Sequence, residues 1–338
     1  MSNKEQNKTM QAIVFEFGLL VLFSFIIGLG SSMVGISGGV FRTPLLILVF
    51  GLTAQFSTAV SLFAALFLAI PSSIEYNRNE KKPIMFKLGL LITLLAIPGL
   101  LIGVFLKSMI VDDYILRIIF GVSLTPIAIM MLLTKGKPNR ADNECNDTEY
   151  DIARNSIRRM IIAGFACFVA GIAGAMLGLG GGVIIVPALC IVLGMPMLIA
   201  AATSVFSIIF ISIAGTIMNL AIIPQIDNIS LFIFYSVALA IGMIFGGKIG
   251  ASFACKVDGV LLKRIFGVIL VFPLVHLMYL GQLWLDPLGT NPLLGIVADI
   301  IIWILIVIPC AFVWIYWRSN NRALEQKRIV DIAESKGS

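Results

Sequence analysis

Charged side chains are scarce in this sequence. Asp, Glu, Lys and Arg together make up 12% of its 338 residues, against about 25% in soluble domains. Hydrophobic residues make up 59%. So few charges cannot cover the surface of a chain of this length in water. The composition therefore excludes a soluble globular protein and indicates one that is embedded in a lipid bilayer.

Residues that build metal sites and catalytic centres are also few. The sequence has one histidine, and its five cysteines form no Cys-x-x-Cys pair, so a metal or redox site is not indicated. No nucleophile stands beside a base, and no paired carboxylates are visible. We expect no enzyme activity, no catalytic or metal-binding residues and no cofactor. The net charge of +6 comes from short basic loops and the C-terminus, so it predicts membrane topology and not nucleic-acid binding.

The sequence does contain a long internal repeat. Residues 28–44, GLGSSMVGISGGVFRTP, match residues 171–187, GIAGAMLGLGGGVIIVP, at an offset of 143 with seven of 17 positions identical. Further along, VDDYILRIIFGV (111–122) matches VDGVLLKRIFGV (257–268). A self-match at a fixed offset indicates two copies of one unit.

Apolar segments form two sets of five, and one further segment follows. They cover about 12–34, 40–52, 54–77, 84–106, 114–134, 160–178, 183–195, 197–223, 229–251, 260–282 and 293–317. A straight crossing needs about 20 apolar residues, so segments 40–52 and 183–195 either cross incompletely or form re-entrant hairpins. We expect an all-α polytopic membrane protein with two repeats of about five helical elements, glycine-broken short helices and one extra C-terminal transmembrane helix. The expected divisions are a polar tail (1–11), repeat 1 (12–134), a linker (135–159), repeat 2 (160–282), the extra helix (293–317) and a tail (318–338).

Lysine and arginine gather in alternate loops. They follow the third and ninth apolar segments, fill the linker 135–159 and recur in the tail 318–338. Loops rich in these residues stay on the cytoplasmic side. The pattern therefore predicts a multi-pass cell-membrane protein with its N-terminus outside and its linker and C-terminus in the cytoplasm. Each half then holds an odd number of elements, so the repeats are expected to be inverted.

Glycines interrupt each half just before its short apolar segment. The first break contains Gly38 and Gly39, and the second contains Gly180, Gly181 and Gly182. Glycine lets a chain leave helical geometry without steric cost, and a break within a bilayer is tolerated where it is buried or lines a wet cavity. A short helix that restarts there can direct free N–H groups at an anion. The alternative is close packing of helices through small residues.

Each short segment also contains a proline, Pro44 in the first half and Pro187 in the second. Proline is best tolerated in the first turn of a helix, where no N–H is needed. These prolines therefore suit the first turn of a restarting helix, with Thr43 as a candidate N-cap before Pro44. The short segments, starting at Val40 and Val183, would present their N-terminal amides.

Arg42 lies at the first break, far from either end of a long apolar stretch. A charge within the membrane is costly and indicates a functional site by default. Its guanidinium presents a planar fork that suits carboxylate, sulfonate or phosphate groups. The matching residue of the second half is Ile185, so the halves differ chemically. The alternative is that Arg42 pairs with backbone carbonyls or extends to the cytoplasmic surface.

Small hydroxyl side chains gather at corresponding places in the two halves. They are Ser37 at the first break, and Ser57, Thr58, Ser61, Thr203 and Ser204 near the start of the third segment of each half. Hydroxyls can solvate an anion, although they often bond the preceding turn of their own helix. Together with Arg42 and the glycines of the two breaks, they form the predicted substrate-binding site.

These glycine motifs resemble those of the sulfite exporter TauE/SafE family. The resemblance covers about residues 12–282 and rests on the second-half pattern of Gly174, Gly178, Gly180–Gly182 and Pro187, with GISGGVFRTP as its degenerate first-half copy. Ser37 stands where the second half has Gly180. The resemblance implies a secondary transporter of sulfite, sulfonates or related small anions, often an exporter.

We therefore expect a transporter that moves a small anion by alternating access, with the lipid bilayer as its surroundings and a proton as a candidate coupling ion. Asp299, in the last apolar segment, is a candidate proton carrier or arginine partner. One alternative is an anion channel whose glycine breaks form a fixed filter. Another is a membrane-embedded enzyme, for which no catalytic constellation is visible. The anion, the direction of transport and the oligomeric state stay open at this point.

Overall fold

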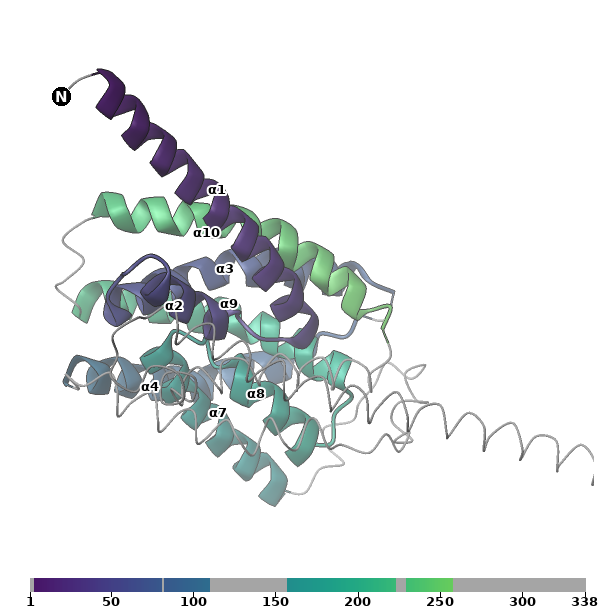
Figure 1. The fold of residues 1–338 in the computed structure, drawn as a ribbon. Helices are drawn as coiled ribbons and strands as arrows, with labels where there is room; N and C mark the ends of the chain where they lie inside the picture. The colour runs from purple at the N-terminus through teal and green to yellow at the C-terminus, as the bar shows by residue number, and fades with distance from the viewer. Residues whose placement is uncertain (1–2, 81, 110–156, 223–228, 258–338) are drawn as a thin grey trace, which may run out of the picture. The chain divides into compact units, whose positions relative to one another are not determined.

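The computed structural model describes residues 3–80, 82–109, 157–222 and 229–257, drawn as ribbons in Figure 1. All helices in these ranges belong to one compact unit, residues 1–116 with 133–266. A second unit, residues 117–132 with 267–338, lies outside the described ranges. Also outside them are the expected segments 114–134, 260–282 and 293–317, most of the linker, the C-terminal tail and Asp299.

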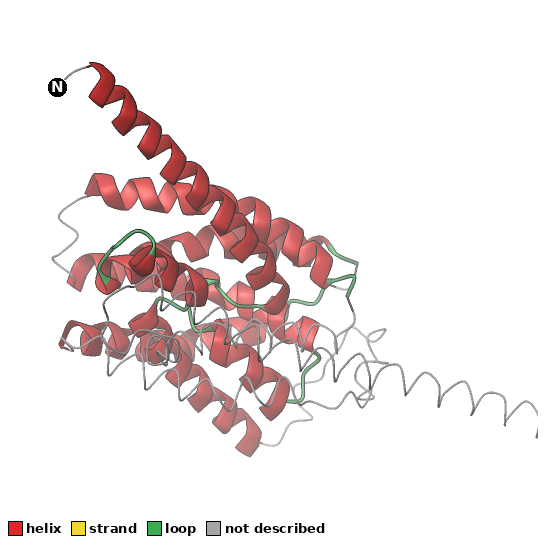
Figure 2. Cartoon of the chain, viewed as in Figure 1, coloured by secondary structure: helices red, strands yellow, loops and turns green. Residues whose placement is uncertain are grey.

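The described part of the chain is helical, and Figure 2 shows helices and loops with no strand among the described residues. The first half contains α1 (Asn3–Val34), α2 (Gly39–Leu48), α3 (Ala54–Arg78) and α4 (Phe86–Met109). The second contains α7 (Ile157–Leu177), α8 (Gly182–Pro187), the π-helical turn η2 (Ala188–Val192), α9 (Met197–Ile222) and α10 (Ile229–Ala254). The expected all-α architecture is confirmed for these residues.

Six of these helices, α1, α3, α4, α7, α9 and α10, are long and apolar enough to cross a membrane. Many of their large hydrophobic side chains are exposed, as on a surface that faces lipid. The 10 residues of α2 are too few for a straight crossing, which needs about 20. The same holds for α8 with η2, Gly182–Val192. The chain is therefore a multi-pass membrane protein with a short helical element in each half.

The two halves interlock through their outer helices. In Figure 1, α1 crosses over α10, and α4 packs in the same way on α7. Glycines allow these contacts, because a Cβ on Gly99 would lie 2.1 Å from the carbonyl oxygen of Phe168, and one on Gly246 would lie 2.3 Å from that of Phe25. The first helix of each half is thus held by the fourth helix of the other, through small residues that let backbones approach.

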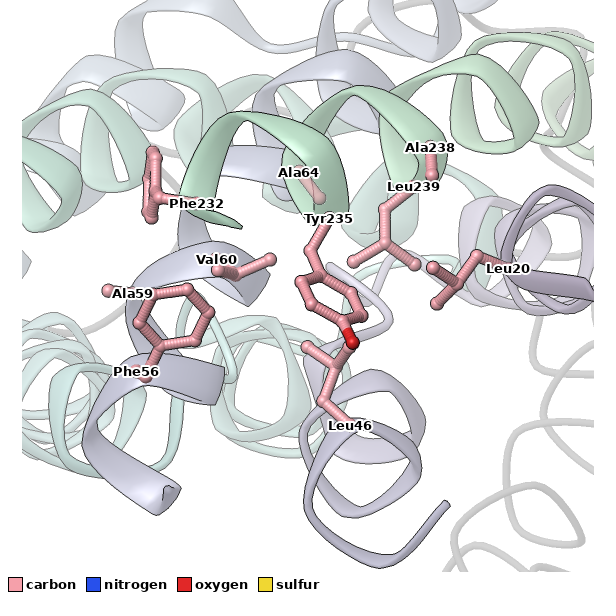
Figure 3. Close-up of a cluster of buried hydrophobic side chains, with 10 residues drawn as sticks. All are labelled: Leu20, Leu46, Phe56, Ala59, Val60, Ala64, Phe232, Tyr235, Ala238 and Leu239. Carbon is pink, nitrogen blue, oxygen red and sulfur yellow. The ribbon is translucent and has the colours of Figure 1, made fainter. Parts of the chain in front are cut away.

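A hydrophobic cluster joins the first half to α10 (Figure 3). Tyr235 and Leu239 of α10 lie between Leu20 of α1, Leu46 of α2 and residues of α3. The cluster consists of Leu20, Leu46, Phe56, Ala59, Val60, Ala64, Phe232, Tyr235, Ala238 and Leu239. It anchors α2 against α3 and so fixes the position of the first glycine break.

The short helices begin at the glycines and not near the prolines. Gly38 and Gly181 are the N-caps of α2 and α8, and both have φ of 78°, in the left-handed region that favours glycine. Pro44 and Pro187 are therefore the sixth residues of their helices, and the expectation that they lie in a first turn with Thr43 as N-cap was wrong. After Pro187 the helix continues as the π-helical turn η2.

Candidate functional site

The two glycine breaks lie against each other. A Cβ on Gly39 would lie 1.9 Å from the carbonyl oxygen of Gly178, and one on Gly182 would lie 2.7 Å from that of Gly35. Gly39 and Gly182 are separated by the repeat offset of 143 residues, and so are Gly35 and Gly178. The same backbone approach is therefore made twice, with the roles of the two halves exchanged.

A pair of hydrogen bonds follows the same exchange. Ser61 on α3 donates to the Gly178 carbonyl at 3.2 Å, and its repeat mate Ser204 on α9 donates to the Gly35 carbonyl at 2.9 Å. Each half thus supplies a hydroxyl to a carbonyl that the break of the other half leaves without a helical partner. Irregular backbone within a membrane is tolerated when its polar groups have hydrogen-bond partners of this kind.

Two further hydroxyls of the first half bind the second break. Ser37 donates to the carbonyl oxygen of Leu179, and Thr43 donates to that of Leu177 at 3.1 Å. Ser37 also lies against Gly180, where a Cβ would be 2.8 Å from the Ser37 Cβ. Thr43, placed as an N-cap from sequence, is thus a contact between the halves.

Arg42 is fully buried beside this junction. It lies on α2, three residues after Gly39, and its side chain is 0% exposed. Its Nε donates to Ser61 Oγ at 3.4 Å, and Nη2 donates to the Ser61 carbonyl at 2.8 Å. Nη1 is buried without a hydrogen-bond partner among the described residues. Pairing with a backbone carbonyl, the alternative drawn from sequence, is therefore present, but it uses only one side of the guanidinium.

A second buried cation, Lys107, is described besides Arg42. Among the side chains that the structure describes, the buried set contains two cations, Arg42 and Lys107, and no aspartate or glutamate. Lys107, at the end of α4, is 4% exposed, and its Nζ donates to Thr58 Oγ1, to Asn219 Oδ1 and to the carbonyl of Gln55. Sequence reasoning missed Lys107, because a lysine one residue beyond an apolar segment resembles an ordinary membrane-interface residue.

The other predicted site residues fall into two groups. Ser57 lies near the start of α3, and Ser31 lies near the end of α1. Both hydroxyls are buried without a hydrogen-bond partner among the described residues. Thr203 is turned elsewhere, because its Oγ1 accepts the N–H of Met85 at 3.1 Å, just before α4. Hydrogen bonds and close approaches thus bring together these predicted residues around the breaks: Ser37, Gly39, Arg42, Ser61, Gly180, Gly182 and Ser204. No described hydrogen bond joins Thr203 to them.

Comparison with known proteins agrees with this architecture. A family model described as sulfite exporter TauE/SafE matches residues 20–277, which include every described spanning helix in whole or large part. The chain belongs to the TauE/SafE family. Both glycine breaks, Arg42 and Lys107 lie within the matched residues.

Curated relatives of this TauE/SafE protein bear the names of transporters and not of enzymes. The probable membrane transporter protein YunE of Bacillus subtilis is 29% identical over 277 residues, covering 78% of this chain and 98% of the relative. A probable membrane transporter protein of Methanocaldococcus jannaschii is 28% identical over 272 residues, covering 76% and 95%. No solved structure matches the chain significantly. The protein is accordingly a membrane transporter of this family.

Proposed function

We propose that this protein is a secondary transporter of a small oxyanion, with sulfite and organosulfonates as the leading substrates. The observation that carries the proposal is Nη1 of Arg42, a buried charged donor with no acceptor among the described residues. An unmade hydrogen bond at a charged group costs more than the usual 1–3 kcal/mol of a neutral one. An oxyanion oxygen beside Nη1 would supply the missing acceptor and neutralise the charge.

Other groups around Arg42 suit the same ligand. α2 begins at Gly39, so its first amides lie within one turn of Arg42, and helix N-termini attract anions. The unpartnered hydroxyls of Ser31 and Ser57 could each donate to an oxyanion after a small rotation. We include Ser37, Gly38, Gly39, Ser57, Ser61, Gly180, Gly181, Gly182 and Ser204 with Arg42 in the proposed substrate site. The hydroxyls of Thr58 and Thr203, also predicted from sequence, have partners elsewhere, with Lys107 and Gln55 for Thr58 and with Met85 for Thr203.

Burial of Arg42 favours a carrier over a channel with a fixed filter. A filter must keep its ligands open to the pore, whereas the Arg42 side chain is 0% exposed. An anion can reach it only if the packed breaks separate. Because these contacts join one half of the chain to the other, movement of one half against the other would open the site, as alternating access requires.

We further propose that the repeats are inverted, with the N-terminus outside and the C-terminus in the cytoplasm. The contacts around Lys107 support antiparallel α3 and α9, because it bonds both Thr58 near the start of α3 and Asn219 near the end of α9. Helices at the same place in two repeats run antiparallel when the repeats are inverted. The alternation of basic loops supplies the absolute orientation.

Cysteine tags will test this topology. In a cysteine-free background, we expect Glu80→Cys, between α3 and α4, to be shielded from an impermeant thiol reagent in intact cells. Asp227→Cys, between α9 and α10, should react, because inversion places corresponding loops on opposite sides. Permeabilised cells provide the control, since both tags should then react. Labelling of both positions from the same side of intact cells would disprove the inversion.

A ligand screen will test the substrate class. Purified protein would be heated with sulfite, sulfate, thiosulfate, sulfoacetate and short carboxylates at constant ionic strength. A ligand present at ten times its Kd should raise the Tm by roughly 2–4 °C. The best ligand would then be tested for saturable counterflow in proteoliposomes. Saturable exchange supports a carrier, whereas conductance without saturation would favour a channel and contradict the proposal.

A further inference from the structure

Lys107 is held in a cage of oxygen atoms that comes from both halves of the chain. Its Nζ donates to Asn219 Oδ1 at 3.3 Å, to the Gln55 carbonyl at 3.4 Å and to Thr58 Oγ1. Gln55 and Thr58 lie on α3, and Asn219 lies on α9. An ammonium has three N–H donors, and these three oxygens can accept all of them.

The cage is oriented for a cation and not for an anion. The Thr58 hydroxyl gives its own proton to the Gln55 carbonyl at 2.9 Å, so its lone pairs are left for the ammonium. Asn219 Nδ2 donates to the Gly215 carbonyl at 2.7 Å, which turns its Oδ1 toward Lys107. All three groups thus present acceptors only. Lys107 therefore differs from Arg42, which retains an unused donor.

A carbonyl, a hydroxyl and an amide oxygen are also the ligands that small hard cations prefer. Transporters hold sodium with oxygens of this kind, including backbone carbonyls. The second half has no counterpart, because Lys107 corresponds to Gly250, which packs closely on the Leu29 carbonyl.

We propose that Lys107 is a tethered cation that permanently fills a sodium-type site between the two halves. The lysine supplies the positive charge that a bound ion would otherwise carry, so the protein needs no sodium at this place. Removing the ammonium leaves its oxygens without a cation, and sodium then becomes their natural ligand.

Thermal unfolding of purified Lys107→Ala in sodium chloride and in choline chloride of equal ionic strength will test this inference. The parent protein should have the same Tm in both salts. The variant should have a lower Tm in choline and should regain about 2–4 °C when sodium reaches ten times its Kd. Adding Thr58→Val to Lys107→Ala should weaken the sodium response at least tenfold. Lys87→Ala, an exposed lysine of the same helix, should respond to neither salt.

Two outcomes would overturn the inference. One is specific stabilisation of the parent by sodium, and the other is a folded Lys107→Ala protein with the same Tm in sodium and in choline. If Lys107→Ala does not fold in either salt, Thr58→Val alone decides, because it keeps the ammonium and removes one acceptor. Its Tm should fall and sodium should not restore it, whereas recovery in sodium would contradict a filled site. None of these measurements needs a substrate, so their results stand apart from the proposed transport activity.

Discussion

Replacing Arg42 with glutamine will weaken anion binding by roughly one to two orders of magnitude. A charge-assisted hydrogen bond contributes about 1.5–3 kcal/mol, and about 1.4 kcal/mol corresponds to a factor of ten in Kd. Arg42 is the buried cation with a donor to spare, and its repeat mate is Ile185, so the other half offers no substitute. Calorimetry on the purified variant, with the best ligand from the screen, will measure the change.

Two further variants separate charge from geometry. Arg42→Lys should recover only part of the affinity, because an ammonium lacks the planar fork and cannot keep both contacts with Ser61 while reaching a ligand. Arg78→Gln removes an exposed arginine at the end of α3 and should leave binding unchanged. Binding by folded Arg42→Gln as tight as that of the parent would remove Arg42 from the site and leave the amides of the glycine breaks as the anion-binding groups.

Gly39→Ala should cause the largest loss of stability of any single methyl addition at the breaks. Its new Cβ would lie 1.9 Å from the Gly178 carbonyl oxygen, a backbone atom that cannot turn aside. Overpacking typically costs 1–3 kcal/mol, so we expect a loss of about 3 kcal/mol. At about 1.5–3 °C per kcal/mol, scaled from shorter domains to a chain of this length, the Tm in detergent should fall by roughly 4–9 °C.

Matched alanine substitutions will show whether this loss comes from the meeting of the breaks. Gly18→Ala on α1 meets nothing within 4 Å and should keep or raise the Tm, because alanine favours helix. Gly182→Ala, the repeat mate, should lower the Tm by less, since its Cβ would lie 2.7 Å from the Gly35 carbonyl. A Gly39→Ala protein as stable as the parent would show that the two breaks separate easily.

The helical elements could be predicted because their signals are local. Apolar length placed all six described spanning helices, and the glycines placed both short ones. The expected starts, Val40 and Val183, are one residue from those observed, but the first-turn role of Pro44 and the N-cap role of Thr43 were wrong, because Gly38 already supplies the left-handed turn that begins α2. Local backbone geometry at glycine outweighed the preference of proline for a first turn.

The partners of the site residues could not be predicted, because they come from distant parts of the chain. Ser61 and Gly178 are 117 positions apart, and Lys107 and Asn219 are 112 apart. Hydroxyl composition suggested Thr203 as strongly as Ser204, yet the first contacts Met85 and the second contacts the break. The choice between packing and binding for the glycines was also open in sequence, and the approach of Gly39 to Gly178 shows that packing is part of their role.

The interlocked outer helices also set the order in which the protein can mature during synthesis. Chains grow from the N-terminus, so α1 to α4 enter the bilayer before α7 and α10 exist. Until then, the faces of α1 that receive Gly246 and Gly250, and the face of α4 that carries Gly99, meet lipid instead of a partner. The earliest helix of the chain therefore waits for the last described one, α10, before its packing is complete. A chain that stops before residue 229 would contain the pair of α4 and α7, but its α1 would lack α10, and such exposed unpaired surface favours misassembly.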